Sequence, residues 1–278
     1  MIESGILYIV ATPIGNLGDI SFRAVNILQE VALIAAEDTR HSAFLLNHYQ
    51  IQTPLISLHK FNESKRVDLF LEYLQQGKSI ALISDAGTPL ISDPGAFLVT
   101  QLQAARITIV PVPGCCALIA ALSASGLPTD HFVFEGFLPA KPAERRKCLA
   151  ALCAETRTLI FYEAPHRILA SVEDLAAVFG ADRPIVLAKE LTKTFETFWH
   201  GGAGDALTWL TSNPAHQKGE FVVLVQGAKI VQTEAINPEA LRILDILSSE
   251  LPLKQAAALT AKITGEKKNR LYAKVISH

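Results

Sequence analysis

Residues 6–21 read ILYIVATPIGNLGDIS, an apolar run followed by a loop rich in proline and glycine. The apolar run has the length and composition of a buried strand, and Ser21 lies where the N-cap of a following helix belongs. The segment therefore predicts a strand, a loop and a helix in succession, the unit from which open α/β sheets are built. Ligands of such sheets bind beyond the carboxyl ends of the strands, which makes the loop at 11–21 a candidate cofactor site.

The same alternation continues through the first part of the chain. A second helical pattern follows Ser64 and stops at Gly77. Alternation of this kind is typical of parallel strands joined by crossover helices, so we expect an N-terminal α/β domain over residues 1–112. The strand candidates are residues 6–11, 31–36, 54–58, 79–84 and 107–112.

A turn signal at Pro113 and Gly114 interrupts this pattern, and a helix rich in small residues follows at 115–126. Long helices are expected only after Lys141 and His166, and this shortage of crossovers favours mixed strand pairing. We therefore expect a second α/β domain over residues 113–228, with a cofactor in the cleft between the two domains. Its strand candidates are residues 131–137, 158–164, 184–190, 194–201 and 219–227.

The remaining residues, 229–278, show only helical patterns and are expected to form a small appendage. From residue 254 onward the basic residues are Lys254, Lys262, Lys267, Lys268, Arg270 and Lys274, and Glu266 is the single acid. Such a basic surface suits phosphate contact, although charge runs are more often a solvated helix face.

The totals of the sequence exclude several classes of protein. The 278 residues are half apolar and suffice for more than one core. No apolar run approaches the roughly 18 positions that a membrane span needs, and the N-terminus lacks the features of a signal peptide, so a cytoplasmic protein is expected. Four cysteines suggest neither a disulfide framework nor a zinc site. A net charge of −2 argues against a protein that coats nucleic acid by bulk electrostatics.

Three loops after predicted strands carry chemistry. Residues 11–21 match neither the dinucleotide fingerprint nor a P-loop, and alone they would indicate a tight turn. Residues 85–95, DAGTPLISDPG, hold two carboxylates, two glycines and two prolines, more than a connector needs, so ligand binding is favoured. Residues 36–42, AEDTRHS, gather Glu37, Asp38 and Arg40. These residues could serve catalysis. Equally well, Asp38 or Thr39 could cap the next helix while Arg40 forms an ion pair with Glu37.

Polar residues also end three further strands. Residues 57–63, SLHKFNE, contribute His59 and Lys60, residues 162–167 contribute Glu163 and Arg167, and residues 189–196 contribute Glu190 and Lys193. A capped helix or a solvated loop would look similar. Their distribution over both halves of the chain is what a cleft between two domains requires.

Taken in order, these segments resemble one known family. ATPIGNLGDIS, AEDTR, LHKFNE, SDAGTPLISDPG, VPGCCALIAALSASGLP, YEAPHR, ELTK and GEFVVLV together are similar to a group of small-subunit ribosomal RNA methyltransferases in the tetrapyrrole methylase superfamily. The resemblance covers nearly the whole chain. It implies S-adenosylmethionine as cofactor, a homodimer and 2′-O-methylation of a cytidine ribose in 16S ribosomal RNA or the small ribosomal subunit.

The resemblance also implies the cofactor site. Ser84, Asp85 and Ala86 stand where relatives have Gly-Asp-Pro, and Cys115 and Cys116 where they often have a serine pair, so backbone groups rather than hydroxyls are expected to bind the cofactor. Tyr162 and the turn at 219–221 would complete the adenosine pocket. The implied cofactor-binding residues are Pro13, Gly15, Asn16, Gly18, Ser84, Asp85, Ala86, Gly87, Thr88, Pro89, Cys116, Ala117, Tyr162 and Glu220.

For methyl transfer to a ribose hydroxyl, a positioned base should remove the proton. The catalytic candidates are Glu37, Asp38, Arg40, His59, Glu163 and Glu190, and the RNA-binding candidates are Lys60, Arg167, Lys193, Lys267, Lys268, Arg270 and Lys274. Two alternatives remain open: a methyltransferase of the same fold that acts on a tetrapyrrole, and an RNA-binding module without catalysis. The polar loops argue against the first, and the retained carboxylates argue against the second.

Overall fold

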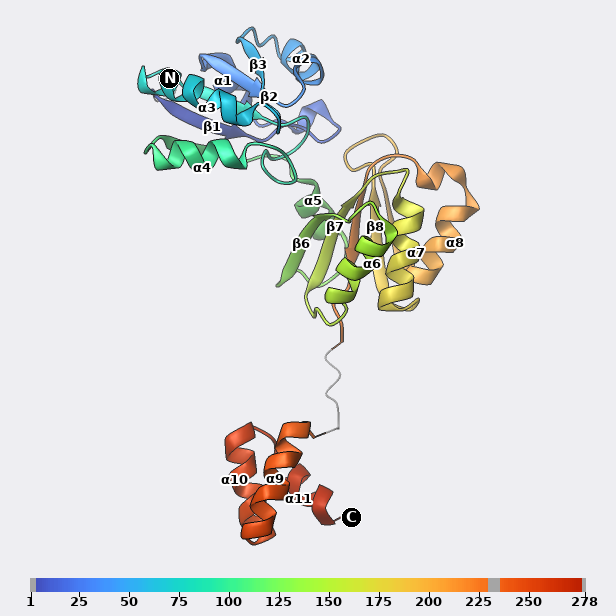
Figure 1. Ribbon diagram of the computed structural model, residues 1–278. Helices are drawn as coiled ribbons and strands as arrows, with labels where there is room; N and C mark the ends of the chain where they lie inside the picture. Colours follow the sequence, from blue (N-terminus) through green and yellow to red (C-terminus); the bar gives the residue numbers. More distant parts are fainter. Residues whose placement is uncertain (1–3, 230–235, 277–278) are drawn as a thin grey trace. The chain divides into compact units, whose positions relative to one another are not determined.

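The computed structural model describes residues 4–229 and 236–276, and it falls into two compact units, Met1–Ala228 and Lys229–His278. The larger unit contains two five-stranded sheets, one built from the first part of the chain and one from the second (Figure 1).

The first sheet is entirely parallel, with the strand order β3-β2-β4-β1-β5. Side chains of β1 alternate between two apolar clusters: Tyr8 packs with α1 and α2, and Leu7 packs with α3 and α4. Helices therefore cover both faces, as the sequence pattern predicts. The strands are β1 (Ile6–Val10), β2 (Leu33–Ala36), β3 (Leu55–Ser57), β4 (Ile80–Ile83) and β5 (Thr108–Val112). The helices are η1 (Leu17–Asp19), α1 (Phe22–Glu30), α2 (Thr39–His48), α3 (Glu63–Gln75) and α4 (Ala96–Ala104).

Local chemistry fixes where these helices begin and end. The Ser21 hydroxyl accepts a hydrogen bond from the backbone N–H of Ala24 at 3.1 Å, which confirms the predicted N-cap of α1. Gly77, with φ of +78°, follows α3 in the left-handed region that glycine adopts without strain. Because the strands are parallel, the carboxyl ends of β1, β2, β3 and β4 lie at one edge of the sheet, and each is followed by the N-terminus of a helix.

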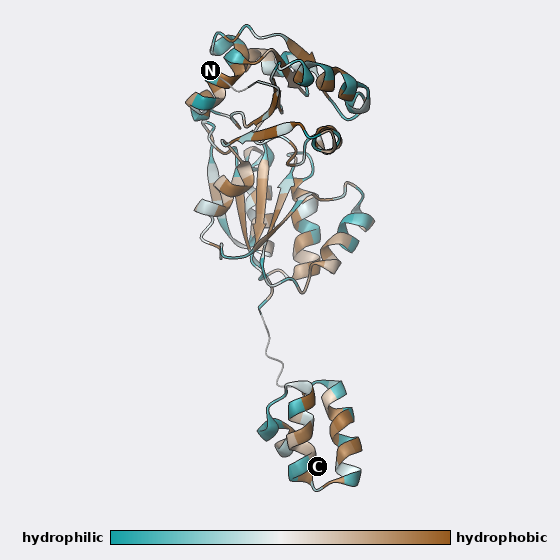
Figure 2. Ribbon diagram, turned by 90° about the vertical axis from the view of Figure 1, so that its left-hand side faces the viewer, coloured by the Kyte–Doolittle hydropathy of each residue, from teal (hydrophilic) through white to brown (hydrophobic). Residues whose placement is uncertain are grey.

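The second sheet has the order β6-β7-β10-β8-β9, in which β6 and β7 are parallel and the other pairs antiparallel, so the predicted mixed pairing is confirmed. Its strands are largely apolar (Figure 2). The strands are β6 (Phe132–Phe137), β7 (Thr158–Glu163), β8 (Pro184–Lys189), β9 (Thr197–Gly202) and β10 (Phe221–Val225). The helices are α5 (Ala117–Ala124), α6 (Pro142–Ala151), α7 (Ile168–Phe179), α8 (Ala203–Ser212) and η2 (Pro214–Gln217).

Helix α8 corrects the expectation that long helices occur only after Lys141 and His166. Its ten residues equal the length of α6. The sequence interpretation ended a strand at residue 201 and placed no helix after it, but Gly202 serves as the N-cap of α8, and Ala203 and Leu210 are buried against the sheet. Tertiary packing therefore overrides a weak local propensity.

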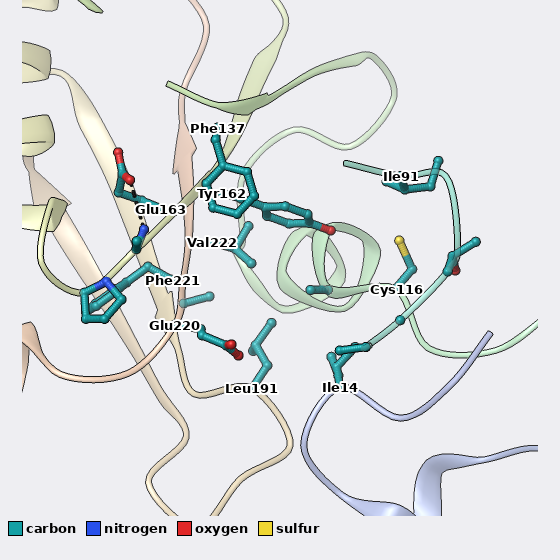
Figure 3. A pocket seen from close by; sticks show the side chains of 17 residues that line it. Ile14, Ile91, Cys116, Phe137, Tyr162, Glu163, Leu191, Glu220, Phe221 and Val222 are labelled. Carbon is teal, nitrogen blue, oxygen red and sulfur yellow. Dashed lines mark hydrogen bonds between the residues drawn. The ribbon is translucent and has the colours of Figure 1, made fainter. Parts of the chain in front are cut away.

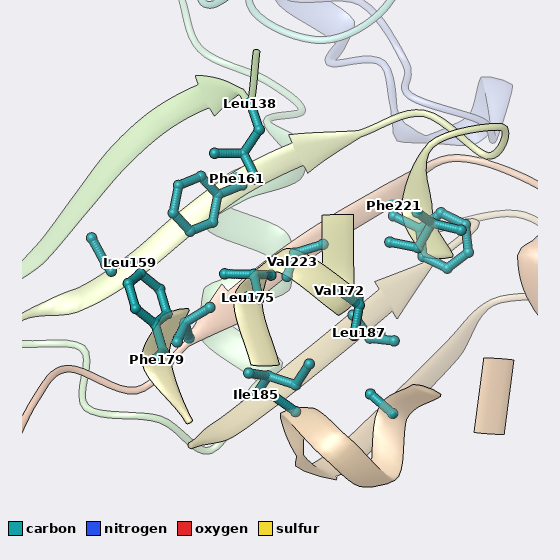
Figure 4. Packing of buried hydrophobic residues seen from close by; sticks show 14 of the residues in the cluster. Leu138, Leu159, Phe161, Val172, Leu175, Phe179, Ile185, Leu187, Phe221 and Val223 are labelled. Carbon is teal, nitrogen blue, oxygen red and sulfur yellow. The ribbon is translucent and has the colours of Figure 1, made fainter. Parts of the chain in front are cut away.

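One face of the second sheet packs against α6, α7 and α8 around Phe161, Val172 and Leu187 (Figure 4). A buried ion pair fastens α6 to α7: Arg145 Nε lies 2.6 Å from Asp174 Oδ2, and both side chains are at least nine-tenths buried. Helix α5 and the loops before it cover the other face, around Leu118 and Val222.

The smaller unit is a three-helix cluster of α9 (Pro238–Glu250), α10 (Leu253–Thr264) and α11 (Lys268–Ile276). Leu244, Ala257 and Leu271 form its core. The Asn237 side chain accepts a hydrogen bond from the N–H of Glu239 and caps α9. None of the helices in residues 4–229 and 236–276 has the length and apolar character needed to cross a membrane.

Candidate active site

A cavity of about 320 Å³ lies where loops of the first sheet meet strands of the second. In Figure 3, Ile14 and Ile91 lie across the cavity from Phe137 and Tyr162. Its volume is within the range of small-molecule sites. The lining residues are Ile14, Ala86, Gly87, Thr88, Ile91, Cys116, Ala117, Phe137, Tyr162, Glu163, Ala164, Pro165, Ala188, Leu191, Glu220, Phe221 and Val222.

Two loops that are far apart in the sequence form one wall of this cavity. The backbone N–H of Thr12 donates to the carbonyl of Gly87 at 2.9 Å, and the N–H of Gly87 donates back at 3.0 Å. The Thr88 hydroxyl donates to the carbonyl of Cys115 at 3.0 Å and ties this loop to the start of α5. The loops at 11–21 and 85–95 are therefore held together by hydrogen bonds and form one continuous wall of the cavity.

Tyr162 provides an aromatic surface on the opposite wall. Its ring makes edge contacts with Phe134 and Phe137 at centroid distances of 4.8 and 5.7 Å. Its hydroxyl oxygen accepts a hydrogen bond from the N–H of Leu118 at 3.2 Å. Burial, and then the nearby Cys116 thiol, raise the pKa of Tyr162, so the hydroxyl stays protonated at neutral pH. The ring is thus fixed and uncharged, as binding of a planar heterocycle requires.

Carboxylates gather at the carboxyl edge of the first sheet. Burial, followed by the charges of Asp85 and Asp93, raises the pKa of Glu37, and nearby His59 opposes this shift. Burial likewise raises the pKa of Asp93, against a hydrogen bond from Ser84. Asp85 is fixed by the N–H of Asp38, which donates to its Oδ1 at 2.9 Å. None of these three carboxylates is in the lining of the cavity, but Asp85 directly precedes the lining residue Ala86, and Asp93 acts electrostatically on Tyr162.

Half of the predicted cofactor-binding residues line the cavity, namely Ala86, Gly87, Thr88, Cys116, Ala117, Tyr162 and Glu220. The others, Pro13, Gly15, Asn16, Gly18, Ser84, Asp85 and Pro89, belong to the same loops but are not in its lining. Some of these support the loops: Asn16 accepts from the N–H of Gly18 and caps η1, and the Ser84 hydroxyl donates to the carbonyl of Ala86. The sequence interpretation did not single out the apolar wall formed by Ile91, Phe137, Leu191 and Val222.

Asp38 and Arg40 form a local structure at the start of α2. The Asp38 side chain accepts from the N–H of Arg40 at 2.8 Å and pairs with its guanidinium at 3.0 Å. Hydrogen bonds from Arg40 lower the pKa of Asp38 to about 2. Asp38 is therefore the N-cap of α2, as one of the two interpretations predicted. The ion pair predicted between Arg40 and Glu37 was wrong, because Arg40 pairs with Asp38 instead. The pKa of Asp38 is thus lowered and that of Glu37 raised, so the two neighbouring carboxylates of this loop differ in their affinity for a proton.

Glu163 and Arg167 are engaged with each other. Arg167 Nε lies 3.2 Å from Glu163 Oε1, and the guanidinium also donates to the carbonyl of Leu138. The second oxygen of Glu163 accepts from the Ser171 hydroxyl, and Oε1 accepts from the N–H of Ala164 at 2.9 Å. Glu163 was predicted as a catalytic base and Arg167 as an RNA contact. Either function would require these contacts between Glu163, Arg167 and Ser171 to break.

Glu190 and Lys193 belong to a similar network. Lys193 Nζ lies 3.0 Å from Glu190 and 2.9 Å from Glu220, and the Glu190 carboxylate also accepts from the N–H of Glu220. Burial raises the pKa of Glu190, but these hydrogen bonds outweigh it and lower the value. A Cβ at Gly15 would lie 2.5 Å from Cγ of Lys193, so this side chain packs directly on the first loop. Lys193 therefore packs against the loop at 11–21 and is not in the lining of the cavity.

The other predicted cations differ in exposure and pairing. Lys60 is exposed and has no ion-pair partner within residues 4–229 and 236–276. In the smaller unit, Lys267, Lys268 and Lys274 are exposed, and Arg270 lies 3.4 Å from Glu266. The described residues contain no group of three or more His, Cys, Asp or Glu with the geometry of a metal site.

Comparison with known proteins agrees with this architecture. Residues 6–207 match the family model of tetrapyrrole (corrin/porphyrin) methylases, and residues 234–277 match the RsmI C-terminal helix-turn-helix domain. A solved cobalt precorrin-4 methyltransferase superposes with a TM-score of 0.60 at 17% identity, covering 80% of this chain and 95% of that one. A uroporphyrin-III C-methyltransferase from Thermus thermophilus has a TM-score of 0.57 at 20% identity, covering 80% and 94%. These solved structures show the fold.

The fold and the cavity thus define a methyltransferase with two α/β lobes. The ribosomal RNA small subunit methyltransferase I of Pseudomonas aeruginosa is 58% identical over 99% of this chain and 98% of its own length. The protein of the same name from Escherichia coli O157:H7 is 55% identical over 97% and 94%. The chain belongs to the tetrapyrrole methylase family, and within it to the ribosomal RNA small subunit methyltransferase I group.

Proposed function

We propose that this protein transfers a methyl group from S-adenosylmethionine to the 2′-hydroxyl of a cytidine ribose in 16S ribosomal RNA. The observation that carries the proposal is the cavity between the two sheets, whose loop 85–95 also carries Asp85 and Asp93, the two carboxylates that act electrostatically on Glu37. The relatives at 58% and 55% identity, whose names specify small-subunit ribosomal RNA, support this substrate.

The residues of the cavity suit S-adenosylmethionine. Tyr162 and Val222 offer a flat apolar surface for a purine, and the small residues Ala86 and Gly87 permit close approach of a ligand to the backbone. The negative charges of Glu37, Asp85 and Asp93, on the loops that follow β2 and β4, would favour a cation such as a sulfonium. When bound there, S-adenosylmethionine would supply an already activated methyl group.

Glu37 is our choice for the general base. A ribose hydroxyl reacts as a nucleophile as it loses its proton, and a carboxylate with a raised pKa accepts that proton more readily than an ordinary one. The charges of Asp85 and Asp93 keep the pKa of Glu37 above its usual range after burial has raised it. His59, which acts on Glu37 electrostatically, would stabilise the ionised base. Positioning of the ribose by the surrounding loops would supply the remaining acceleration.

The smaller unit would contribute affinity for RNA. Its exposed Lys267, Lys268 and Lys274 can neutralise phosphates, and its match to a helix-turn-helix domain supports a nucleic-acid contact. Together with the larger unit this makes 16S ribosomal RNA, free or within the small subunit, the partner. We further propose that the protein acts in the cytoplasm as a homodimer, as the family resemblance implies.

The decisive experiment combines binding with turnover. Calorimetry should detect binding of S-adenosylmethionine to the purified protein, and labelled methyl groups should be transferred to small ribosomal subunits from cells that lack the protein. Mass spectrometry of digested RNA should locate the label on a cytidine ribose. Transfer to a porphyrin or corrin precursor without transfer to ribosomal subunits would contradict the proposal and favour the tetrapyrrole alternative.

A further inference from the structure

The loop at residues 59–62, between β3 and α3, presents an exposed aromatic ring beside a cation that has no ion-pair partner among the residues that the structure describes. Phe61 has 87% of its surface exposed, and the adjacent Lys60 is exposed as well. Single exposed apolar residues are common on protein surfaces, so exposure alone indicates little. The combination of ring, cation and position relative to Glu37 makes this loop different.

Pairing distinguishes Lys60 from the other loop cations of the larger unit that we predicted to contact RNA. Arg167 is held by Glu163, and Lys193 is held by Glu190 and Glu220. A cation already paired within the protein must break that contact before it can bind a phosphate. Lys60 has no ion-pair partner within the described residues, so it can contact a phosphate without this cost.

The loop is rigid even though its two side chains are exposed. The side chain of Asn62 accepts from the N–H of His59 at 2.9 Å and donates to the carbonyl of Ser57 at 3.1 Å. The N–H of Phe61 donates to Nδ1 of His59 at 3.3 Å, and the two rings make an edge contact with centroids 6.1 Å apart. A ring held in this way binds a partner with little loss of conformational freedom.

Hydrogen bonds connect this loop to the catalytic candidates. The N–H of Leu58 donates to the carbonyl of Ala36 at 2.7 Å, and the Ser57 hydroxyl donates to the carbonyl of Glu37 at 3.4 Å. Through Asp38, the loop of Glu37 is in turn bonded to Asp85, next to the cavity wall at Ala86. The 59–62 loop is therefore joined to the loop that carries the proposed base, and its first residue, His59, acts electrostatically on Glu37.

We propose that Lys60 and Phe61 form a nucleotide platform, on which an unstacked base of the RNA lies against Phe61 while Lys60 contacts a neighbouring phosphate. Proteins commonly recognise unpaired RNA by stacking splayed bases on aromatic side chains, and such stacking tolerates any base. The platform would thus hold the target nucleotide so that its ribose faces Glu37, without reading base identity. This inference rests on the proposed function.

Steady-state kinetics with small ribosomal subunits that lack the methylation test the platform. Phe61→Ala should raise the KM for subunits roughly 5- to 100-fold, leave kcat within a few-fold, and leave the Kd for S-adenosylmethionine unchanged. Phe61→Trp should restore the KM and Phe61→Leu should not, because stacking requires an aromatic face. The matched control is Phe132→Ala: Phe132 is 38% exposed at the start of β6, at the opposite end of that strand from Phe137 in the cavity lining, and its loss should leave the KM unchanged.

Salt dependence tests the cation separately. Lys60→Ala should reduce the slope of log binding constant against log salt concentration by about 0.7 to 0.9, the value for one phosphate contact. Lys78→Ala, at the opposite edge of the same sheet, should leave the slope unchanged.

The outcomes separate the platform from the proposed function. Absence of methyl transfer by the wild-type protein would refute the proposed function itself. Normal transfer with an unchanged KM in Phe61→Ala, or full restoration by Phe61→Leu, would overturn the platform alone. A change in oligomeric mass with an unchanged KM would assign Phe61 to a contact between copies of the chain, which also overturns it.

Discussion

Thr12 and Gly87 exchange two backbone hydrogen bonds, with N···O distances of 2.9 and 3.0 Å, although they follow different strands of the first sheet. This pair holds together the two loops that carry Ile14, Ala86 and Thr88 into the cavity. The wall of the proposed cofactor site therefore depends on backbone geometry at least as much as on side chains.

The first prediction concerns Gly87, whose φ of +79° favours glycine. In Gly87→Ala the new Cβ would lie 3.3 Å from Ile14 in the cavity wall, so we expect a loss of about 1–2 kcal/mol of stability together with weaker binding of S-adenosylmethionine. Gly126→Ala is the matched control, since Gly126 has φ of +70° but open space around it. Thermal unfolding should detect both changes, whereas calorimetry should detect weaker binding in Gly87→Ala only. Equal cofactor affinity in the two variants would contradict this role.

The second prediction concerns Glu37 as the base. Glu37→Gln keeps the shape of the side chain but cannot accept the proton, so the rate of methyl transfer should fall roughly 10²- to 10⁴-fold. The Kd for S-adenosylmethionine should rise only a few-fold, because Glu37 loses its charge while Asp85 and Asp93 keep theirs. Single-turnover assays with small subunits measure the rate, and Glu173→Gln, an exposed carboxylate on α7, provides the control. A rate close to that of the wild type would exclude Glu37 and direct attention to His59.

The third prediction concerns pH. Because the pKa of Glu37 is raised above 4.5, the ionised base should appear, and the rate should rise, as pH increases through that raised value. Asp93→Asn removes one of the negative charges that contribute to the shift, so the acidic limb of the rate profile should move to lower pH. Asp68→Asn, on the exposed side of α3, should leave the limb in place. An identical limb in all three proteins would refute the coupling of Glu37 to Asp93.

The fourth prediction concerns the buried ion pair of Arg145 and Asp174. Arg145→Met leaves the Asp174 carboxylate buried with only the more distant Arg146, at 3.5 Å, so unfolding in urea should show a loss of about 3–5 kcal/mol. The double variant Arg145→Met, Asp174→Leu should regain much of this loss, because two apolar groups need no partner. If the double variant were as unstable as the single one, packing around Arg145 rather than its charge would be responsible.

The fifth prediction concerns the smaller unit. A chain ending at Ala228 keeps both sheets of the larger unit, so its affinity for S-adenosylmethionine should equal that of the full chain. Its affinity for small ribosomal subunits should be weaker, and the slope of binding against salt concentration should be shallower, because several lysines are lost. Equal subunit affinity at one salt concentration would show that the smaller unit makes no contact with RNA.

The sequence predicted the alternation of strands and loops well because buried strands are apolar runs and their ends are marked by glycine and proline. This sufficed to place Gly87 and Thr88 at the cavity. It did not suffice for Leu191 and Val222, since an apolar residue that lines a cavity has the same chemical character as one that fills a core. Nothing in the sequence order distinguishes the two.

Ion pairs were the other feature that the sequence could not determine. Arg40 pairs with Asp38 rather than with Glu37, and Arg167 forms an ion pair with Glu163. Such choices depend on side-chain conformation and on which helix turn follows the strand. Charged residues at strand ends therefore identified the region of the site but not the individual role of each residue.

The carboxylates on the loops after β2 and β4 also affect turnover in the proposed reaction. A negatively charged environment attracts a cation more strongly than a neutral molecule of the same outline. The methyl donor carries a positive charge at sulfur, and the thioether left behind after transfer does not. We therefore expect Glu37, Asp85 and Asp93 to bias exchange in the cavity, so that a spent molecule departs and a fresh one replaces it.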